Sequence, residues 1–324
     1  MKLPLVAALA ASFLTTLTGA PGSIAPAAAA TPCAVAAANR PLHTWIRGEV
    51  TASTAVRYSR FRTTSSGWSL IKLGALNADL QLRLYDRSCH ALATSQHRGR
   101  HFEQIYRRLP AGRYYVGVFG VSGATSSYAL RFAPLRDGLR TLSLHAYPEP
   151  GSTGRLEVDG EVLNNRSTPT FFRWATVTFY SSTGRRIATA DATFPQQYVR
   201  ARSRVPFFAD LAKPRHPYSR ITVVTTTEAL NGYPPPPRVT IVAGARRTDS
   251  LGRLHLIGRV TNDSTKPILL GKVLATLYDT YGNVRYVNED PISPDELRPD
   301  RTGAFDVVFD RATGVNAVRF MIHA

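Results

Sequence analysis

Five arginines fall within 16 positions of the sequence, and no other group of side chains is as well suited to bind a ligand. They are Arg98, Arg100, Arg107, Arg108 and Arg113. Each presents a planar fork of N–H donors that matches phosphate, sulfate or carboxylate groups. Aromatic residues lie between them and could stack on sugars or bases, although aromatics on strands more often belong to the core. The pattern predicts an exposed anion-binding patch.

The same stretch has two histidines at a spacing that metal sites use. His97 and His101 are four positions apart, but they fall in an expected loop with no acid or cysteine in ligand spacing. We interpret them as part of a solvated basic loop. Asp79 and Asp86 bracket a strand end, yet two carboxylates fall short of the six to eight oxygens that Ca²⁺ takes. We expect no metal and no cofactor, and the sequence leaves calcium binding open.

The usual catalytic signatures are missing from the chain. It has no His-Glu-x-x-His and no Gly-x-Ser-x-Gly, and the Gly-Val-Ser-Gly of residues 120–123 misses the second spacing. A dispersed Ser, His and Asp set would become visible only in the fold. We therefore expect a protein that is not an enzyme, with a secreted hydrolase of unrecognised site as the alternative.

The elements that must position these residues have the pattern of β-strands. Leu80, Leu82 and Leu84 alternate with polar residues, and in 156–162 the apolar residues alternate with Glu157, Asp159 and Glu161. A period of two predicts a half-buried antiparallel strand with its polar face in water. Helical periodicity is not visible after residue 30. The sequence predicts an all-β protein made of three tandem antiparallel β-sandwich domains.

The second and third of these domains form an internal duplication. Residues 141–226 recur at 239–324 with a constant offset of 98 positions. Gly160 and Phe207 return as Gly258 and Phe305, and Ser181-x-x-Gly184 returns as Asp279-x-x-Gly282, which is typical of a type I turn. We predict domains at 31–138, 139–230 and 238–324, with a proline-rich linker at 231–237.

The beginning of the chain is typical of an exported protein. Residues 1–30 contain Lys2, an apolar stretch and Ala28-Ala29-Ala30, which predicts a signal peptide cleaved after Ala30 or, alternatively, after Ala20. No later stretch is apolar enough to span a membrane. Export favours an oxidising compartment, so we predict that the two cysteines, Cys33 and Cys89, form a disulfide.

The net charge favours acidic partners. The formal charge of the chain is +18, and residues 31–138 carry fifteen Arg or Lys against five Asp or Glu. A basic surface of this kind attracts acidic cell-envelope polymers, acidic polysaccharide, lipid headgroups or nucleic acid. Nucleic acid is the less favoured partner. Genome bias toward Arg and Ala is the competing explanation of the charge.

Two resemblances cover most of the expected exported chain. Residues 42–134 resemble the bacterial pre-peptidase C-terminal domain, on Ala78-Asp79-Leu80-x-Leu82-x-Leu84-Tyr85-Asp86 and Leu109-Pro110-Ala111-Gly112-x-Tyr114-Tyr115-Val116. The duplicated units look like the domain named for its FxLYD motif, on Ala275-Thr276-Leu277-Tyr278-Asp279 and Val177-Thr178-Phe179-Tyr180-Ser181. Both resemblances imply extracellular-type β-sandwiches, and neither implies a catalytic set.

These observations together predict a secreted or cell-surface binding or scaffolding protein that contacts acidic cell-envelope polymer or polysaccharide through its first domain. Besides the hydrolase, one further alternative is an accessory subunit that binds a protein partner by pairing at a sheet edge.

Overall fold

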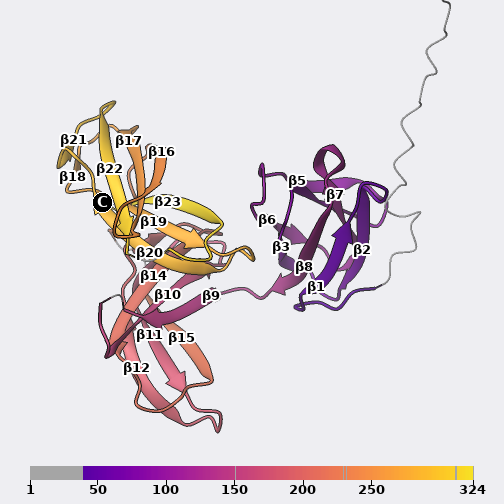
Figure 1. The fold of residues 1–324 in the computed structure, drawn as a ribbon, viewed down its shortest axis with the longest axis horizontal. Helices are drawn as coiled ribbons and strands as arrows, with labels where there is room; N and C mark the ends of the chain where they lie inside the picture. Colours follow the sequence, from indigo (N-terminus) through magenta and orange to yellow (C-terminus); the bar gives the residue numbers. More distant parts are fainter. Residues whose placement is uncertain (1–38, 150, 229, 231, 311, 324) are drawn as a thin grey trace, which may run out of the picture.

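The computed structural model describes residues 39–149, 151–228, 230, 232–310 and 312–323, and they form an all-β protein. Antiparallel strands build several sheets, and the helical content of the described residues is a single 3-10 turn, Val121–Gly123. The predicted fold class is confirmed. In Figure 1 the first eight strands form one body, in indigo and purple, and the remaining strands form two more.

The first unit is a sandwich of two four-stranded sheets, with orders β1-β8-β3-β6 and β2-β7-β4-β5. Leu80, Leu82 and Leu84 of β4 are fully buried between the sheets, so the predicted alternation is confirmed. The strands are β1 (Ile46–Val50), β2 (Val56–Thr63), β3 (Gly67–Gly74), β4 (Leu80–Tyr85), β5 (Ala91–Ser95), β6 (Glu103–Leu109), β7 (Gly112–Gly120) and β8 (Ser126–Leu135).

The second unit has one sheet of order β14-β10-β9, and a second in which β11 pairs with β12, β13 and β15. Its core contains Phe172, Phe179, Phe194 and Phe207. The strands are β9 (Leu139–Pro148), β10 (Arg155–Asn164), β11 (Thr170–Tyr180), β12 (Arg186–Ala192), β13 (Tyr198–Val199), β14 (Arg204–Ala212) and β15 (Arg220–Glu228).

The third unit repeats this arrangement with sheets β16-β17-β22, β20-β19-β23 and β18-β21. Shifting the second unit by 98 positions gives the same order of paired strands, so the predicted duplication is confirmed. The strands are β16 (Val239–Thr248), β17 (Leu254–Asn262), β18 (Ile268–Leu269), β19 (Lys272–Tyr278), β20 (Val284–Pro291), β21 (Glu296–Leu297), β22 (Thr302–Phe309) and β23 (Ala317–His323).

Two repeated residues explain why both copies fold alike. A Cβ atom added to Gly160 or Gly258 would run into the ring of Phe207 or Phe305, respectively, so each glycine makes room for the phenylalanine on the neighbouring strand. Asn164 and Asn262 are fully buried, and their Nδ2 groups donate to backbone carbonyls at equivalent positions, Val199 and Leu297. Each asparagine thereby satisfies buried carbonyls at the end of a strand.

The sheet β14-β10-β9 of the second unit is covered by strand β20 of the third. One prediction is therefore wrong: Asp159 and Glu161 of β10 do not face water but are buried at this junction, 0% and 1% exposed. In the sequence, these two acids alternate with core residues just as solvent-facing residues would. They are nevertheless buried, because the outer face of this strand meets another unit rather than solvent.

Glu161 is the centre of a buried charge network that joins the three units. Its carboxylate lies 3.2 Å from Arg204 Nη1 and 3.1 Å from Arg319 Nη2. Burial alone would raise the pKa of Glu161, but the two guanidinium groups outweigh burial and lower it. Lys72 on β3 of the first unit donates to the carbonyl of Gly282 at 2.8 Å. Burial lowers the pKa of Lys72 to about 8, although nearby Glu161 acts in the opposite direction.

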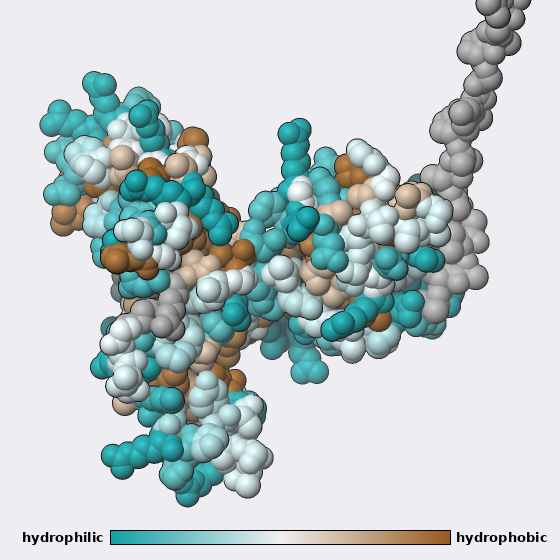
Figure 2. Space-filling model, viewed as in Figure 1, coloured by the Kyte–Doolittle hydropathy of each residue, from teal (hydrophilic) through white to brown (hydrophobic). Residues whose placement is uncertain are grey.

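Apolar contacts accompany these charges. Tyr278, Val284 and Val287 of the third unit form a small core with Phe102 of the first unit and Phe208 of the second. Within the described residues, no helix is long and apolar enough to span a membrane. Figure 2 shows hydrophilic side chains over much of the visible surface. Residues 1–30 and Cys33 lie outside the described residues, so the signal peptide and the Cys33–Cys89 bridge stay predictions.

Candidate functional site

All five arginines of the predicted patch are exposed, but they lie on different elements. Arg98 and Arg100 are in the loop between β5 and β6, and Arg113 begins β7 in the other sheet. Arg107 and Arg108 are neighbours on β6 and therefore point to opposite faces of it. Arg107 donates to the carbonyl of Leu92. None of the five makes an ion pair with the described part of the chain, so their charge is not consumed internally.

The acids and histidines of this region serve local structure. His97 Nδ1 lies 3.0 Å from the carboxylate of Glu103, which also accepts a hydrogen bond from Ser95. Asp79 accepts a hydrogen bond from the amide of Gly99, and Asp86 accepts from the amides of Ser88 and His90. No group of three or more His, Cys, Asp or Glu among the described residues is placed to hold a metal ion.

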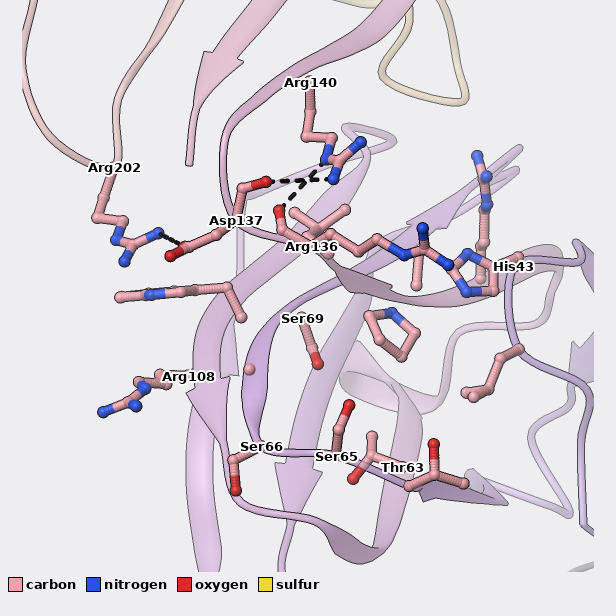
Figure 3. A pocket seen from close by; sticks show the side chains of 18 of the residues that line it. His43, Thr63, Ser65, Ser66, Ser69, Arg108, Arg136, Asp137, Arg140 and Arg202 are labelled. Atoms are coloured by element: carbon pink, nitrogen blue, oxygen red, sulfur yellow. Dashed lines mark hydrogen bonds and ion pairs between the residues drawn. The ribbon is translucent and has the colours of Figure 1, made fainter. Parts of the chain in front are cut away.

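A cleft of about 1240 Å³ opens where the first unit meets the second. Its first wall comes from the end of β2, the turn that follows it and β3, with Thr63, Ser65, Ser66 and Ser69. Its other wall comes from β8, the connection to β9 and the loops of the second unit. Figure 3 shows these hydroxyl side chains on the side opposite Asp137 and Arg140. Of the predicted patch, only Arg108 lines this cleft.

The cleft is strongly cationic. Five arginines line it against one carboxylate, that of Asp137; they are Arg108, Arg131, Arg136, Arg140 and Arg202. Arg202 Nη1 lies 3.2 Å from Asp137, whose side chain is 80% exposed, so water screens this pair. Arg140 donates to the backbone carbonyls of Arg136 and Asp137, both at 3.2 Å, which leaves its charge uncompensated (Figure 3). An anionic group entering the cleft would meet excess positive charge.

Arg131 adds charge to the cleft, but its Nε atom does not mark a ligand site. Its Nε atom is buried and has no hydrogen-bond partner in the described structure. The Nε atoms of Arg83, Arg285 and Arg319 share this property outside the cleft, so it does not distinguish the cleft from the rest of the protein. Ser65 also makes no hydrogen bond with other described residues, and its hydroxyl remains available.

Among the described residues, Trp68 is the one Phe, Tyr or Trp side chain that lines this cleft. Trp68 stacks on Tyr106 with ring centroids 4.6 Å apart, and the Arg202 guanidinium lies 4.8 Å from the Trp68 ring centroid. Tyr106 and Arg202 also share the Oδ1 atom of Asn165 as a hydrogen-bond acceptor, so these side chains form one packed cluster at the junction.

Asn165 fixes the geometry of the junction. It is fully buried, its Nδ2 donates to the carbonyl of Arg136 at 2.6 Å, and its Oδ1 accepts from Tyr106 and from Arg202. Arg202 itself occupies a left-handed turn with φ of 61°, and its amide donates to the carbonyl of Asn164. The third unit repeats this turn at Asp300, with φ of 57°. The two copies thus share the backbone conformation of this turn. The charge at the position differs, because the side chain is arginine in the second unit and aspartate in the third.

The sequence could not have revealed this cleft. Arg131, Arg136, Arg140 and Arg202 were not predicted as site residues, and Arg202 is remote in sequence from the others. The predicted boundary between the domains at 31–138 and 139–230 was the only signal, since two units meet there. The polyanion-binding role predicted for Arg98, Arg100, Arg107 and Arg113 stays a prediction.

No protein family profile matches the chain, and no curated protein matches it. Among solved structures, the pre-peptidase C-terminal domain of a collagenase from Bacillus anthracis is 19% identical, covers 30% of this chain and 93% of that domain, and gives a TM-score of 0.27. A β-glucuronidase from glycoside hydrolase family 2 is 9% identical, with 76% of this chain covered and a TM-score of 0.28.

The chain spans about a quarter of that β-glucuronidase, since the match covers 23% of the enzyme. A DUF4785 family protein from Legionella pneumophila is 11% identical, with 85% and 82% of the two chains covered and a TM-score of 0.17. A pre-peptidase C-terminal domain is thus among the solved structures similar to this chain. The FxLYD resemblance has no support from these comparisons.

Proposed function

We propose that this protein is an exported, non-catalytic binding protein that holds acidic polymers of the cell envelope in the cationic cleft between its first two units. The single observation that carries the proposal is the charge of that cleft, five arginines against one carboxylate. The hydroxyls of the opposite wall support it. The excess of basic residues elsewhere on the first unit would add long-range attraction.

For the competing proposal, a protein partner added at a sheet edge, β16 is the most exposed of the described edge strands. β16 is the outermost strand of its sheet, and most of its residues are exposed. However, its pairing with β17 shifts register between Ala243 and Arg246, and Arg246 and Arg247 follow. Bulges and charges are the devices by which edge strands avoid pairing with another chain, so we favour the cleft.

The test compares two double variants of the full exported chain on immobilised polygalacturonate. Arg108 and Arg136 both line the cleft, are exposed and make no ion pair with described residues, so Arg108→Gln with Arg136→Gln should leave the fold intact. The control, Arg185→Gln with Arg186→Gln, removes the same charge from the exposed β11–β12 turn. Circular dichroism would verify folding of both variants.

We expect the cleft variant to lose about tenfold in affinity at low salt and the control to lose less than about twofold. The salt dependence of binding should also become shallower for the cleft variant, because fewer counterions are displaced. Equal losses in the two variants would refute the cleft as the site. A third variant, Arg98→Gln with Arg100→Gln and Arg113→Gln, tests the predicted patch separately.

A further inference from the structure

The cationic cleft does not end at the junction of the first two units. A second hollow of about 400 Å³ shares Arg202 with it, and a third hollow of about 360 Å³ shares Ser203, Arg204 and Met321 with the second. Three of the shared residues are consecutive in the sequence, at positions 202–204, and the fourth is Met321. Each hollow therefore adjoins the next, and together they touch all three units; we refer to this series of hollows as the track.

The middle hollow has a different chemistry from the cleft. Leu70, Leu142, Leu163 and Met321 give it an apolar lining. Two polar atoms of its lining residues, Gln104 Oε1 and Arg319 Nε, are buried and have no hydrogen-bond partner in the described structure. The charges of Arg204 and Arg319 are balanced by Glu161. This hollow thus offers apolar surface and little net charge.

The third hollow is cationic again. Arg200 and Arg238 line it, both are exposed, and neither makes an ion pair with described residues. Pro236 and Pro237 of the segment between the second and third units form part of its wall. The predicted linker therefore does more than connect two units, because it also forms one wall of the track.

We propose that the track binds a linear acidic polysaccharide, whose carboxylates occupy the two cationic hollows while a sugar ring crosses the middle one. A sugar ring presents an apolar C–H face, which matches the lining by Leu70, Leu142 and Met321. Polyphosphate has no C–H groups and therefore offers no apolar face to this hollow. This inference rests on the proposed function, and it extends that site by two hollows.

The test measures the affinity of the full chain for oligogalacturonates of increasing length, with polyphosphate of matched length as the comparison. Three proteins are used: wild type, Arg200→Gln with Arg238→Gln for the third hollow, and the Arg185→Gln, Arg186→Gln control. Wild-type affinity should rise with length and level off once an oligomer spans the track. The third-hollow variant should match wild type on short oligomers and bind long ones about tenfold more weakly.

Each outcome has a separate meaning. If wild type binds the shortest and longest oligomers equally and the third-hollow variant changes nothing, while the Arg108→Gln, Arg136→Gln variant weakens binding, the track is wrong and the cleft stands. If no oligomer binds and the cleft variant has no effect, the proposed function fails as well. If long polyphosphate binds more tightly than long oligogalacturonate, the polysaccharide assignment is overturned.

Discussion

Glu161 of the second unit accepts a hydrogen bond at 2.7 Å from the hydroxyl of Tyr278 in the third, and both side chains are 1% exposed. The same carboxylate balances Arg204 and Arg319. A buried carboxylate with this many partners ties the units together, because removing it leaves buried cations without a counter-charge.

Replacement of this carboxylate should weaken the molecule strongly. We expect Glu161→Gln to lower the free energy of unfolding in urea by about 3 kcal/mol, since the amide keeps the shape but not the charge. The matched control is Glu296→Gln, whose partner Arg298 lies at the surface. Its loss should stay below about 1 kcal/mol. Equal losses of unfolding free energy in the two variants would mean that the buried network stabilises the protein no more than a surface ion pair does.

Asp159 predicts an unusual dependence of stability on pH. Burial raises its pKa well above the ordinary value, and the neighbouring Glu157 adds to the rise. The folded state therefore binds a proton more tightly than the unfolded state, whose aspartates titrate near pH 3.9. The stabilisation by this group is complete below that pH and is lost as pH rises toward the folded pKa, at up to about 1.4 kcal/mol per pH unit.

Asparagine at this position should mimic the protonated acid. Its side-chain oxygen can still accept from Tyr147 and from the amide of Val287, as Asp159 does now at 2.7 and 2.8 Å. We expect Asp159→Asn to stabilise the protein by about 1–2 kcal/mol at pH 7 and by almost nothing near pH 4. Urea unfolding at the two pH values measures this. A destabilised variant at pH 7 would show that the native carboxylate is charged.

The repeated glycines give a prediction for both copies of the duplication. A Cβ atom at Gly258 would collide with the ring of Phe305 and lie 2.6 Å from the carbonyl oxygen of Val242. We expect Gly258→Ala to cost about 2 kcal/mol, by overpacking. Gly154→Ala is the control, because no heavy atom lies within 4 Å of its added Cβ. Thermal unfolding that ranks the control as more damaging would contradict the packing argument.

The predicted disulfide needs its own measurement, since Cys33 lies outside the described residues. Cys89 sits after β4 in a turn with φ of 67°. We expect the native protein to show no titratable thiol and to show two after reduction. A single bridge across this separation would stabilise the protein by roughly 4 kcal/mol in the loop-entropy account. Detection of two thiols in the unreduced, unfolded protein would show that the disulfide does not form.

The sequence by itself determined the strands and the duplication. Alternation at Leu80, Leu82 and Leu84 and the recurrence of Gly160 and Phe207 at Gly258 and Phe305 are local patterns. They reflect how each strand faces its own core, and each copy needs no information from another part of the chain. Turn glycines such as Gly184 and Gly282 take positive φ in both copies for the same local reason.

Only the tertiary structure decided what the outer faces of these strands meet. Asp159 and Glu161 have the alternation of solvent-facing residues, because a polar face looks the same in sequence whether water or another unit covers it. The cleft likewise brings Arg202 to Arg131, Arg136 and Arg140 through contacts between units, which no spacing along the chain records. The sequence marked the basic first unit, and the docking of the second unit onto it decided which arginines form the site.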